Sequence, residues 1–435
     1  MLERIRTGKR ILIRGGRVID PAAGFDAPAD VLIVDGLIAA RDKPGAIPAD
    51  GAEVFEATGH IVTPGFIDMH VHLREPGYEY KETVATGCFS AVVGGVTSVA
   101  CMANTNPVND NAAVTKYIAE KAMIAGLANV FPVGAVSLGL AGEHLSEIGE
   151  MVEAGIVAVS DDGHPVMNSA LMRRALEYTR MFGIPVIAHE EDHTLCGGGV
   201  MNEGLTSVRL GLRGIPAAAE TVMVARDIEL ARYTRGRLHV AHLSTAESVE
   251  MVRRAKADGL AVTAEATPHH FTLDDTAVEG YNTNAKMYPP LRTPRDVDAV
   301  RRGLADGTID TIATDHAPHH RDEKGVEFDA AAKGIIGLET MLALTLDLVR
   351  QDLLALERAI EAITLAPARN LGLDRGTLAV GRPADVTIFD PERSWRVEAA
   401  QISSKSKNTP FEGWELRGKV VRTIVGGRSV WEDRG

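Results

Sequence analysis

Eight short apolar runs recur through the middle of the chain, separated by stretches of helical pattern. Most of them are apolar at consecutive positions, which is typical of parallel strands buried on both faces. The runs lie in the segments GFIDMHVH, VTSVACMANT, NVFPVGAVS, GIVAVSDDG, IPVIAHEED, RLHVAHLST, LAVTAEATPHH and IDTIATDHAPHH. Eight strand–helix units over about 250 residues have the size of a (β/α)8 barrel. We therefore predict an α/β fold with a TIM-like barrel over residues 65–365, although the runs alone leave an open, doubly wound sheet as an alternative.

One of these units also predicts its helix boundaries. In the segment LHVAHLSTAESVEMVRRAKADG, the strand is followed by Ser244 and, three residues later, by Glu247. This spacing is that of a capping box, in which the two side chains bond the free backbone N–H groups at the start of a helix. We predict that Ser244 is the N-cap and that the helix ends near Gly259.

The two ends of the chain are rich in short strand patterns broken by Gly, Pro and Asp. The first end contains RILIRGGRVID, ADVLIVDGLIAA and AEVFEATGHIVTPG, and the last contains GTLAVGRPADVTIFDP and VVRTIVGGRSVWE. We predict one small β-sandwich domain built from both chain ends, residues 1–64 and 366–435. Two unrelated β patches are the alternative.

Charge and composition exclude several classes of partner. The 435 residues carry a formal net charge of −13 and contain no basic run, which disfavours nucleic acid and anionic membranes. No segment approaches the roughly 18 consecutive apolar residues of a membrane span, and the N-terminus lacks the apolar core of a signal peptide. The three widely spaced cysteines indicate neither a disulfide framework nor a CxxC site. A cytoplasmic enzyme is the expectation.

Side chains able to bind metal or substrate close almost every apolar run. They are His70 and His72, Asn104, Asp161 and Asp162, His189, His242, His269 and His270, and Asp315 and His316. In a barrel these strand ends meet at one rim, which favours the barrel over the open sheet. Imidazole and carboxylate suit Zn²⁺ or a similar divalent ion. We expect four other histidines to be caps or core polar groups: His144, His164, His193 and His239.

The segment DMHVHLREPG places Arg74 two residues after His72. Alternation along a strand would send His70, His72 and Arg74 to one face and Met69, Val71 and Leu73 to the other. A guanidinium can bind a carboxylate through two parallel hydrogen bonds, so a substrate clamp beside the metal is the expectation. A surface ion pair with Glu75 or Glu79 is the alternative for Arg74.

Together the motifs resemble those of class I dihydroorotases, members of the amidohydrolase superfamily. They are DMHVHLREPG, MANTNP, SDDG, AHEED, AHLST, TAEATPHH, KMYPPLR, ATDHAPH, GLET and SKSKNTPFEGWELRG, and they span nearly the whole chain. The resemblance implies reversible cyclisation of N-carbamoyl-L-aspartate to L-dihydroorotate with loss of water, in de novo pyrimidine biosynthesis. It also implies one or two Zn²⁺ ions per chain.

The resemblance assigns roles to individual residues. His70, His72 and Asp315 would hold the more buried metal, His189 and His242 a second one, and Asp162 both; Asp161 is an alternative to Asp162. Asp315 would also be the catalytic acid/base. The substrate contacts would be His72, Arg74, Asn104, Tyr288, His319 and, through its backbone, Gly334. We expect His269 and His270 to support the site by contacting the metal-binding residues without binding the metal themselves.

The chain departs from the family pattern at three positions. Tyr288 stands where an asparagine contact is expected, Ala103 where proline is usual, and Lys333 where an apolar aromatic residue is common. The first casts doubt on substrate affinity or ring specificity, because a phenol replaces an amide. The surrounding loop, residues 281–294, is either a lid over the substrate or an ordinary ordered connection.

Two other functions are alternatives. Hydantoinases, dihydropyrimidinases and allantoinases resemble this chain, but they and the class II dihydroorotases bridge their metals with a carboxylated lysine, and residues 122–255 contain no lysine. A non-catalytic scaffold for aspartate transcarbamoylase would lose metal ligands, whereas the full set is present here. Self-association and an aspartate transcarbamoylase partner alongside activity stay open.

Overall fold

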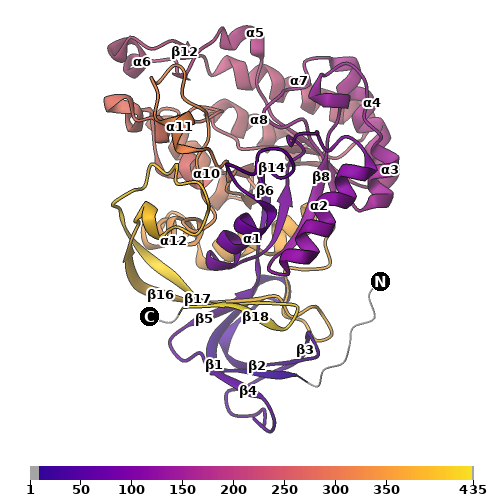
Figure 1. Ribbon diagram of the computed structural model, residues 1–435, viewed down its shortest axis with the longest axis vertical. Helices are drawn as coiled ribbons and strands as arrows, with labels where there is room; N and C mark the ends of the chain where they lie inside the picture. The colour runs from indigo at the N-terminus through magenta and orange to yellow at the C-terminus, as the bar shows by residue number, and fades with distance from the viewer. Residues whose placement is uncertain (1–8, 434–435) are drawn as a thin grey trace.

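The computed structural model describes residues 9–433, which form a barrel and a smaller β domain (Figure 1). In the view of Figure 1 the barrel with its helices lies above and the β domain below. The predicted α/β fold, with a barrel and a β domain built from both chain ends, is confirmed. The first eight and last two residues of the predicted β domain lie outside the described residues.

Eight parallel strands form the barrel, one from each predicted apolar run. They are β6 (Phe66–Val71), β7 (Val96–Cys101), β8 (Asn129–Gly134), β9 (Ala158–Val159), β10 (Val186–Ala188), β13 (Leu238–Val240), β14 (Val262–Ala266) and β15 (Thr311–Ile312). They pair in chain order from β6 to β15. Just past the strand ends, a bridge between Val71 and His316 joins the two edges, and the His72 N–H donates to the His316 carbonyl at 2.9 Å. The open, doubly wound sheet is thereby excluded.

Helices surround this barrel. The α-helices are α1 (Val84–Val93), α2 (Ala112–Ala125), α3 (Ile148–Ala154), α4 (Ser169–Thr179), α5 (His193–Cys196), α6 (Leu205–Leu210), α7 (Ala218–Thr234), α8 (Ala246–Ala257), α9 (Pro268–Thr272), α10 (Pro294–Ala305), α11 (Arg321–Lys324), α12 (Met341–Arg350), α13 (Leu356–Ile363) and α14 (Leu365–Leu371). Short 3₁₀ turns are η1 (Pro21–Ala23), η2 (Leu138–Leu140), η3 (Arg180–Phe182), η4 (Asp275–Tyr281), η5 (Thr283–Ala285) and η6 (Ala399–Gln401). Neighbouring helices pack on one another, as α4 does on α7, α7 on α8 and α8 on α10. None of the helices in residues 9–433 is long and apolar enough to cross a membrane.

The start of α8 differs by one residue from the prediction. Thr245, not Ser244, is the N-cap, and its side chain accepts from the Ser248 N–H. The Ser244 hydroxyl instead donates to the buried carboxylate of Glu220. The helix ends at Ala257, close to the predicted end at Gly259. Ser244, which the local pattern predicted as the N-cap, therefore forms a tertiary hydrogen bond instead of capping the helix.

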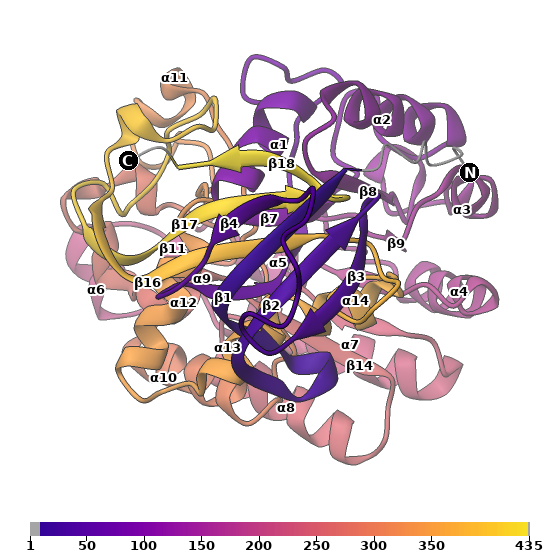
Figure 2. The same cartoon turned by 90° about the horizontal axis from the view of Figure 1, so that it is seen from below.

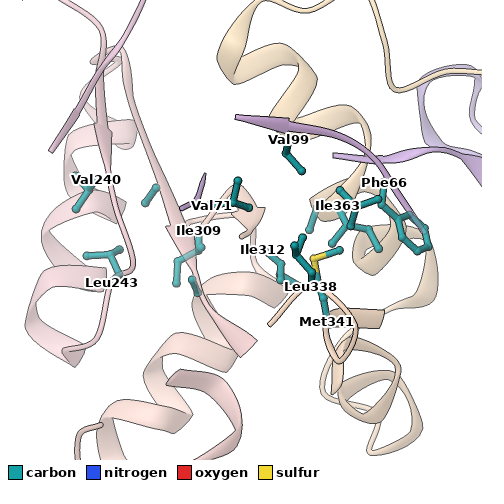
Figure 3. Packing of buried hydrophobic residues seen from close by; sticks show 14 of the residues in the cluster. Phe66, Val71, Val99, Val240, Leu243, Ile309, Ile312, Leu338, Met341 and Ile363 are labelled. Atoms are coloured by element: carbon teal, nitrogen blue, oxygen red, sulfur yellow. The ribbon is translucent and has the colours of Figure 1, made fainter. Parts of the chain in front are cut away.

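The largest hydrophobic core lies between the strands and the helices. It includes Phe66, Val99, Ile312, Leu338 and Ile363, all buried, and Figure 3 shows how residues of this cluster pack. A second cluster contains one small or apolar residue from most strands and fills the barrel interior: Met69, Ala100, Val133, Ala158, Ile187, Ala241 and Ala313. Burial on both faces explains why the strands read as continuous apolar runs.

Met69 is in this interior cluster, whereas Val71 and Leu73, predicted to share its face, belong to the core between strands and helices. The pairing of β6 with β7 shifts register between Asp68 and Val71, which is the mark of a β-bulge. A bulge adds a residue to one strand and breaks strict alternation. The bulge therefore lets Met69 fill the barrel interior directly before His70.

Strands from both chain ends form the β domain. They are β1 (Arg10–Asp20), β2 (Phe25–Val34), β3 (Leu37–Asp42), β4 (Glu53–Glu56), β5 (Ile61–Pro64), β16 (Val386–Arg396), β17 (Glu415–Val425) and β18 (Arg428–Glu432). Hydrogen bonds join all eight into one sheet, in which β5 lies between β1 and β16. Figure 2 shows the indigo N-terminal strands beside the yellow C-terminal ones. A separate two-stranded sheet, β11 (Met201–Asn202) with β12 (Gly214–Ile215), lies in a loop of the barrel.

The chain passes from the β domain into the barrel through a single residue, Gly65, and returns after α14. Gly65 lies between the end of β5 at Pro64 and the start of β6 at Phe66. A Cβ at this position would collide with the side chain of Thr97 on β7. The first barrel strand is therefore a direct continuation of the β domain, and the carboxyl end of β6 points away from that domain.

Candidate active site

The side chains predicted to bind metal gather at the carboxyl ends of the barrel strands in two overlapping groups. The first contains His70, His72, Asp162 and Asp315, and the second contains Asp162, His189 and His242. Within each group the potential ligand atoms lie within 4.8 Å of one another, and every residue is buried. This grouping is the one that the family resemblance implied.

Asp162 lies at the centre of the cluster. Its Oδ1 is 3.4 Å from His70 Nε2, from His189 Nδ1 and from His242 Nε2. Its Oδ2 is 3.4 Å from His72 Nε2. One carboxylate thus faces four imidazoles that come from three different strands, the arrangement needed for a ligand shared by two ions.

Asp161 is turned away from the cluster. Its Oδ1 accepts hydrogen bonds from the backbone N–H groups of Val136 and Ser137, at 2.7 and 3.0 Å. Its Oδ2 accepts from the Ser137 hydroxyl. Of the two adjacent aspartates, Asp162 alone belongs to the groups at the centre of the barrel rim.

The donor set suits a divalent cation. His70 Nε2 and Asp162 Oδ1 are buried, face each other and have no hydrogen-bond partner. Burial alone would raise the pKa of Asp162, but the charge of His70 and the nearby imidazoles of His189 and His242 hold it well below its usual range. Because buried polar atoms are rarely left unpaired, these two atoms indicate a missing positive partner. Imidazole and carboxylate without thiolate are ligands that suit zinc and similar ions.

Two carboxylates that sequence reasoning did not single out fix the imidazole rings. Glu265 Oε1 lies 2.6 Å from His70 Nδ1, and Glu191 Oε2 lies 3.1 Å from His189 Nε2. A carboxylate behind a metal-binding histidine sets its tautomer and orientation. Glu265 also bonds His239, which is a satisfied core group, as expected. The only sequence signal for Glu265 was a charged residue between two alanines of a buried strand.

Among residues 9–433, no hydrogen bond joins the side chains of His269 and His270 to the cluster. His270 bonds the Thr267 hydroxyl at 2.8 Å and the Pro289 carbonyl at 3.0 Å. Burial and the nearby charge of His242 lower the pKa of His270 to about 4, so this imidazole is neutral. The supporting residue of this strand is therefore Glu265, and His270 instead holds the loop that contains Tyr288.

Three residues of the site have an unusual backbone. Arg74, His242 and Asp315 have φ values of 62°, 31° and 46°. Such conformations cost free energy in non-glycine residues and cluster at functional sites. At Arg74 the positive φ also corrects a prediction, because β6 ends at Val71 and Arg74 reaches the site from a turn instead of continuing the strand face.

A cavity of about 180 Å³ lies against the cluster. Nine of the predicted site residues line it: His72, Arg74, Asn104, Asp162, His189, His242, Tyr288, Asp315 and His319. Arg74 makes no ion pair with Glu75 or Glu79 in the described chain; its Nε donates to the Pro318 carbonyl at 3.1 Å. Asn104 Oδ1 lies 2.9 Å from His72 Nδ1 and so helps to orient that ring.

His319 forms the wall of the cavity beside Arg74. Its Nε2 lies 2.9 Å from the Lys333 carbonyl, which can only accept, so the proton is on Nε2. Burial and the charges of Arg74 and Lys81 lower the pKa of His319 to about 3. The imidazole is therefore neutral at physiological pH.

Gly334 lies next to His319 but is absent from the cavity lining. Its N–H donates to the Lys286 carbonyl at 3.0 Å, and its carbonyl accepts from Lys324 and Asn408, both at 3.0 Å. Its φ is 154°, and a Cβ there would lie 2.8 Å from the His319 ring. A substrate contact at Gly334 stays a prediction.

The Amidohydrolase family matches residues 61–430, which is most of the chain. The chain belongs to the amidohydrolase family. Among curated proteins, it is 59% identical over 420 residues to a dihydroorotase of Geotalea daltonii, covering 97% of this chain and 99% of that one. It is 57% identical over 422 residues to a dihydroorotase of Citrifermentans bemidjiense, with the same coverage.

Among solved structures, this amidohydrolase is similar to an L-hydantoinase (dihydropyrimidinase) from Arthrobacter aurescens. The TM-score is 0.87 at 26% identity, with 97% of this chain and 96% of the other covered. A dihydropyrimidinase from Brevibacillus agri gives a TM-score of 0.83 at 24% identity, covering 98% and 95%. The second likeness shows the fold alone.

In this amidohydrolase the two unusual residues near the substrate cavity are neighbours. The Lys333 ammonium lies 3.3 Å from the centroid of the Tyr288 ring, and both residues line the cavity. The Tyr288 hydroxyl donates to the Gly199 carbonyl. In the same loop, Lys286 donates to the carbonyls of Phe328 and Asp329 at 2.7 and 2.9 Å. Residues 283–288 are thus tied to the neighbouring loops, which supports an ordered connection without testing a lid.

Proposed function

We propose that the chain is a dihydroorotase, which interconverts N-carbamoyl-L-aspartate and L-dihydroorotate. The observation that carries the proposal is Arg74, whose guanidinium lines the same cavity as the His/Asp cluster. The substrate has a ring amide to open and a carboxylate to hold, and this cavity offers a group for each. Curated relatives that are 56–59% identical over nearly the whole chain bear the name dihydroorotase, which supports the same function.

Arg74 is the carboxylate clamp. Its Nε donates to the Pro318 carbonyl at 3.1 Å and its Nη2 lies 3.4 Å from His319 Nε2, so Nη1 and the other N–H of Nη2 form the fork for the substrate. Such a fork binds a carboxylate through two parallel hydrogen bonds. The neutral His319 ring beside it adds no charge that would compete with Arg74 for the anion. In this proposal Asn104 and Tyr288 contact the rest of the ring.

Asp315 is the proton carrier. Its Oδ1 lies 2.9 Å from His72 Nε2 at the bottom of the cavity. During ring opening it accepts a proton from the attacking water and returns it to the departing ring nitrogen. The water oxygen bonds to the carbonyl carbon as the C–N bond breaks, and ring closure is the reverse. The cluster would hold a divalent cation, whose chemistry when bound would be to acidify water and to polarise the carbonyl.

The absence of lysine in residues 122–255, with Asp162 facing four histidines, supports the class I subtype and Zn²⁺. His70, His72, Asp162 and Asp315 would hold one ion, and Asp162, His189 and His242 a second. We further propose a role in pyrimidine biosynthesis and a cytoplasmic location. The domain limits 1–64, 65–365 and 366–435, self-association and an aspartate transcarbamoylase partner stay predictions.

Turnover tests the proposal directly. Purified protein is assayed with dihydroorotate and with N-carbamoyl-aspartate, with and without added zinc, beside hydantoin and dihydrouracil. We expect zinc-dependent turnover of the carboxylated pair alone. Preferential turnover of hydantoin or dihydrouracil would replace the proposal with another cyclic amidohydrolase. No turnover of any ring by zinc-loaded protein would favour the scaffold function, with aspartate transcarbamoylase as the partner to add next.

A further inference from the structure

A second cavity, of about 380 Å³, lies behind the wall formed by His319. It is bounded by α11, by the 283–284 turn and by residues 405–408, which precede β17. Six basic or imidazole side chains line it: His319, His320, Arg321, Lys324, Lys405 and Lys407. The lining contains no aspartate or glutamate, although the chain as a whole carries a formal net charge of −13.

The lysines of this cavity have no acidic partner. Among residues 9–433, Lys324, Lys405 and Lys407 form no ion pair and bond backbone carbonyls instead. An ammonium has three N–H groups; Lys405 uses one, on Glu79, and Lys407 uses two, on Ile402 and Ser404. Both lysines therefore keep a donor for a ligand while the carbonyls hold their ammonium groups in place.

The nearest carboxylates are outside the lining and are already paired. Glu323 lies 2.9 Å from Lys81 and 3.3 Å from His319, and Asp322 lies 3.6 Å from Arg321 and 3.3 Å from His320. These pairs offset Lys81 and part of the charge of Arg321, and the charge of Glu323 also acts on Lys324, whereas Lys405 and Lys407 form no ion pair among residues 9–433. Like charges around a hollow raise its positive potential and favour an anion inside it.

The floor of this cavity is also the back of the substrate cavity. Lys324 and Asn408 both donate to the Gly334 carbonyl at 3.0 Å. The side-chain oxygen of Asn408 also accepts from the backbone N–H of His319 at 3.0 Å. His319 lines both cavities. The three N–H groups of Lys324 are used on the carbonyls of Lys286, Ala332 and Gly334, so a ligand would contact His319 and would act on Lys324 through its charge.

We propose that this cavity is a second binding site, separate from the substrate cavity, for a small anion with at least two negative charges. Phosphate and carboxylate groups both accept charge-assisted hydrogen bonds from ammonium and guanidinium donors. Burial and the neighbouring charge of Lys286 lower the pKa of Lys324 to about 7, and a bound anion keeps this lysine protonated. Binding stiffens the Lys324–Gly334–His319 wall and so changes the KM for substrate.

Calorimetry on the full-length, metal-loaded protein tests the site without relying on turnover. Pyrophosphate and succinate are titrated separately at constant ionic strength, because they distinguish a phosphate ligand from a dicarboxylate. The variant K405Q/K407Q removes two exposed cations from the cavity. The control K43Q/K116Q removes the same charge from exposed lysines elsewhere.

We expect at least one probe to bind, and about tenfold or more weaker binding in K405Q/K407Q, since each charged hydrogen bond contributes on the order of a tenfold change. The control should bind as wild type does. Equal affinity in K405Q/K407Q, or no binding of either probe, would overturn the proposal. If K405Q/K407Q does not fold, R321Q takes its place, because that side chain is 90% exposed.

Discussion

The ammonium of Lys333 lies 3.3 Å from the centre of the Tyr288 ring, at the edge of the substrate cavity. These residues are the two departures from the family pattern that touch the site, and the structure makes them partners. A cation over an aromatic face is attracted by the ring quadrupole. A change at one position is therefore best understood together with the change at the other.

The first prediction concerns this pair. An exposed cation–π contact contributes about 0.5–1 kcal/mol, so K333M and Y288L should be coupled by that amount in their free energies of unfolding. A double-mutant cycle based on urea unfolding measures the coupling. Additive effects of the two changes would mean that the contact contributes nothing to stability.

Arg74 should govern the KM for dihydroorotate. Loss of a charged, two-fold hydrogen bond in R74Q is expected to lower kcat/KM about 10- to 100-fold. R74K keeps the charge but not the planar fork, and should fall between R74Q and wild type. Steady-state kinetics provide the measurement, and metal content by atomic emission provides the control. Unchanged KM in R74Q with full metal content would remove Arg74 from substrate binding.

Glu265 should act on metal affinity through His70. Glu265 Oε1 lies 2.6 Å from His70 Nδ1 and orients the His70 ring. E265Q weakens this hydrogen bond, so we expect about 10- to 100-fold weaker zinc binding. Competition with a chelator measures the affinity. E339Q is the control, since Glu339 is a partly buried carboxylate that accepts hydrogen bonds from Ser90 and Ser403, away from the cluster. Equal zinc affinity in E265Q and wild type would contradict the prediction.

The pair of Glu323 and Lys81 should contribute to stability in a pH-dependent way. Burial acts to raise the pKa of Glu323, but the hydrogen bond and charge of Lys81 lower it from 4.5 to about 2. Between these values the unfolded state binds more protons, so the contribution is fully present above about pH 4.5 and is lost as the pH falls toward 2.

Because the Glu323 side chain is 30% exposed, we expect the contribution to be under about 1 kcal/mol. Urea unfolding of E323Q and wild type from pH 6 downward provides the test. The stability difference between the two proteins should shrink as the pH falls below about 4.5. A difference that is constant over the whole range would show that the charge of Glu323 is not involved.

The three cysteines should be inert in the folded protein. All are buried free thiols, and burial raises the pKa of Cys88 and of Cys101 to about 12. The thiolate is the reactive form, so iodoacetamide at pH 8 should label the chain only after unfolding. Mass spectrometry of native and urea-treated samples decides this, and rapid labelling of the native protein would contradict it.

Structural features that depend on neighbouring residues in the chain were predictable from the sequence. The barrel strands stood out because both of their faces are buried, and His70, Asp162 and His242 stood out because each closes an apolar run. Features that depend on contacts between distant segments were not. Met69 faces the interior because of a bulge in β6, and Thr245 replaces Ser244 as N-cap because Glu220 takes the Ser244 hydroxyl.

The same reason explains the residues of the site that were missed. Glu265 is far from His70 in the chain, and nothing in its own strand indicates the histidine that it supports. Lys333 and Tyr288 were recognised as unusual, but their contact joins two separate loops. Resemblance to a family identified these residues one at a time, whereas the contacts between them are visible only in the three-dimensional structure.

Gly65 has a consequence for anyone who wishes to divide this protein. The strand that carries His70 leaves the β domain after a single residue, and β5 is held on one side by β1 and on the other by β16. A barrel expressed alone would begin at a severed β6, and the strand that carries His70 and leads to His72 would lose its continuation into β5 and be held by β7. New chain ends or inserted domains are better placed in the surface loops. A cut between β5 and β6 would loosen β6 at its start, and this would displace His70 at its carboxyl end.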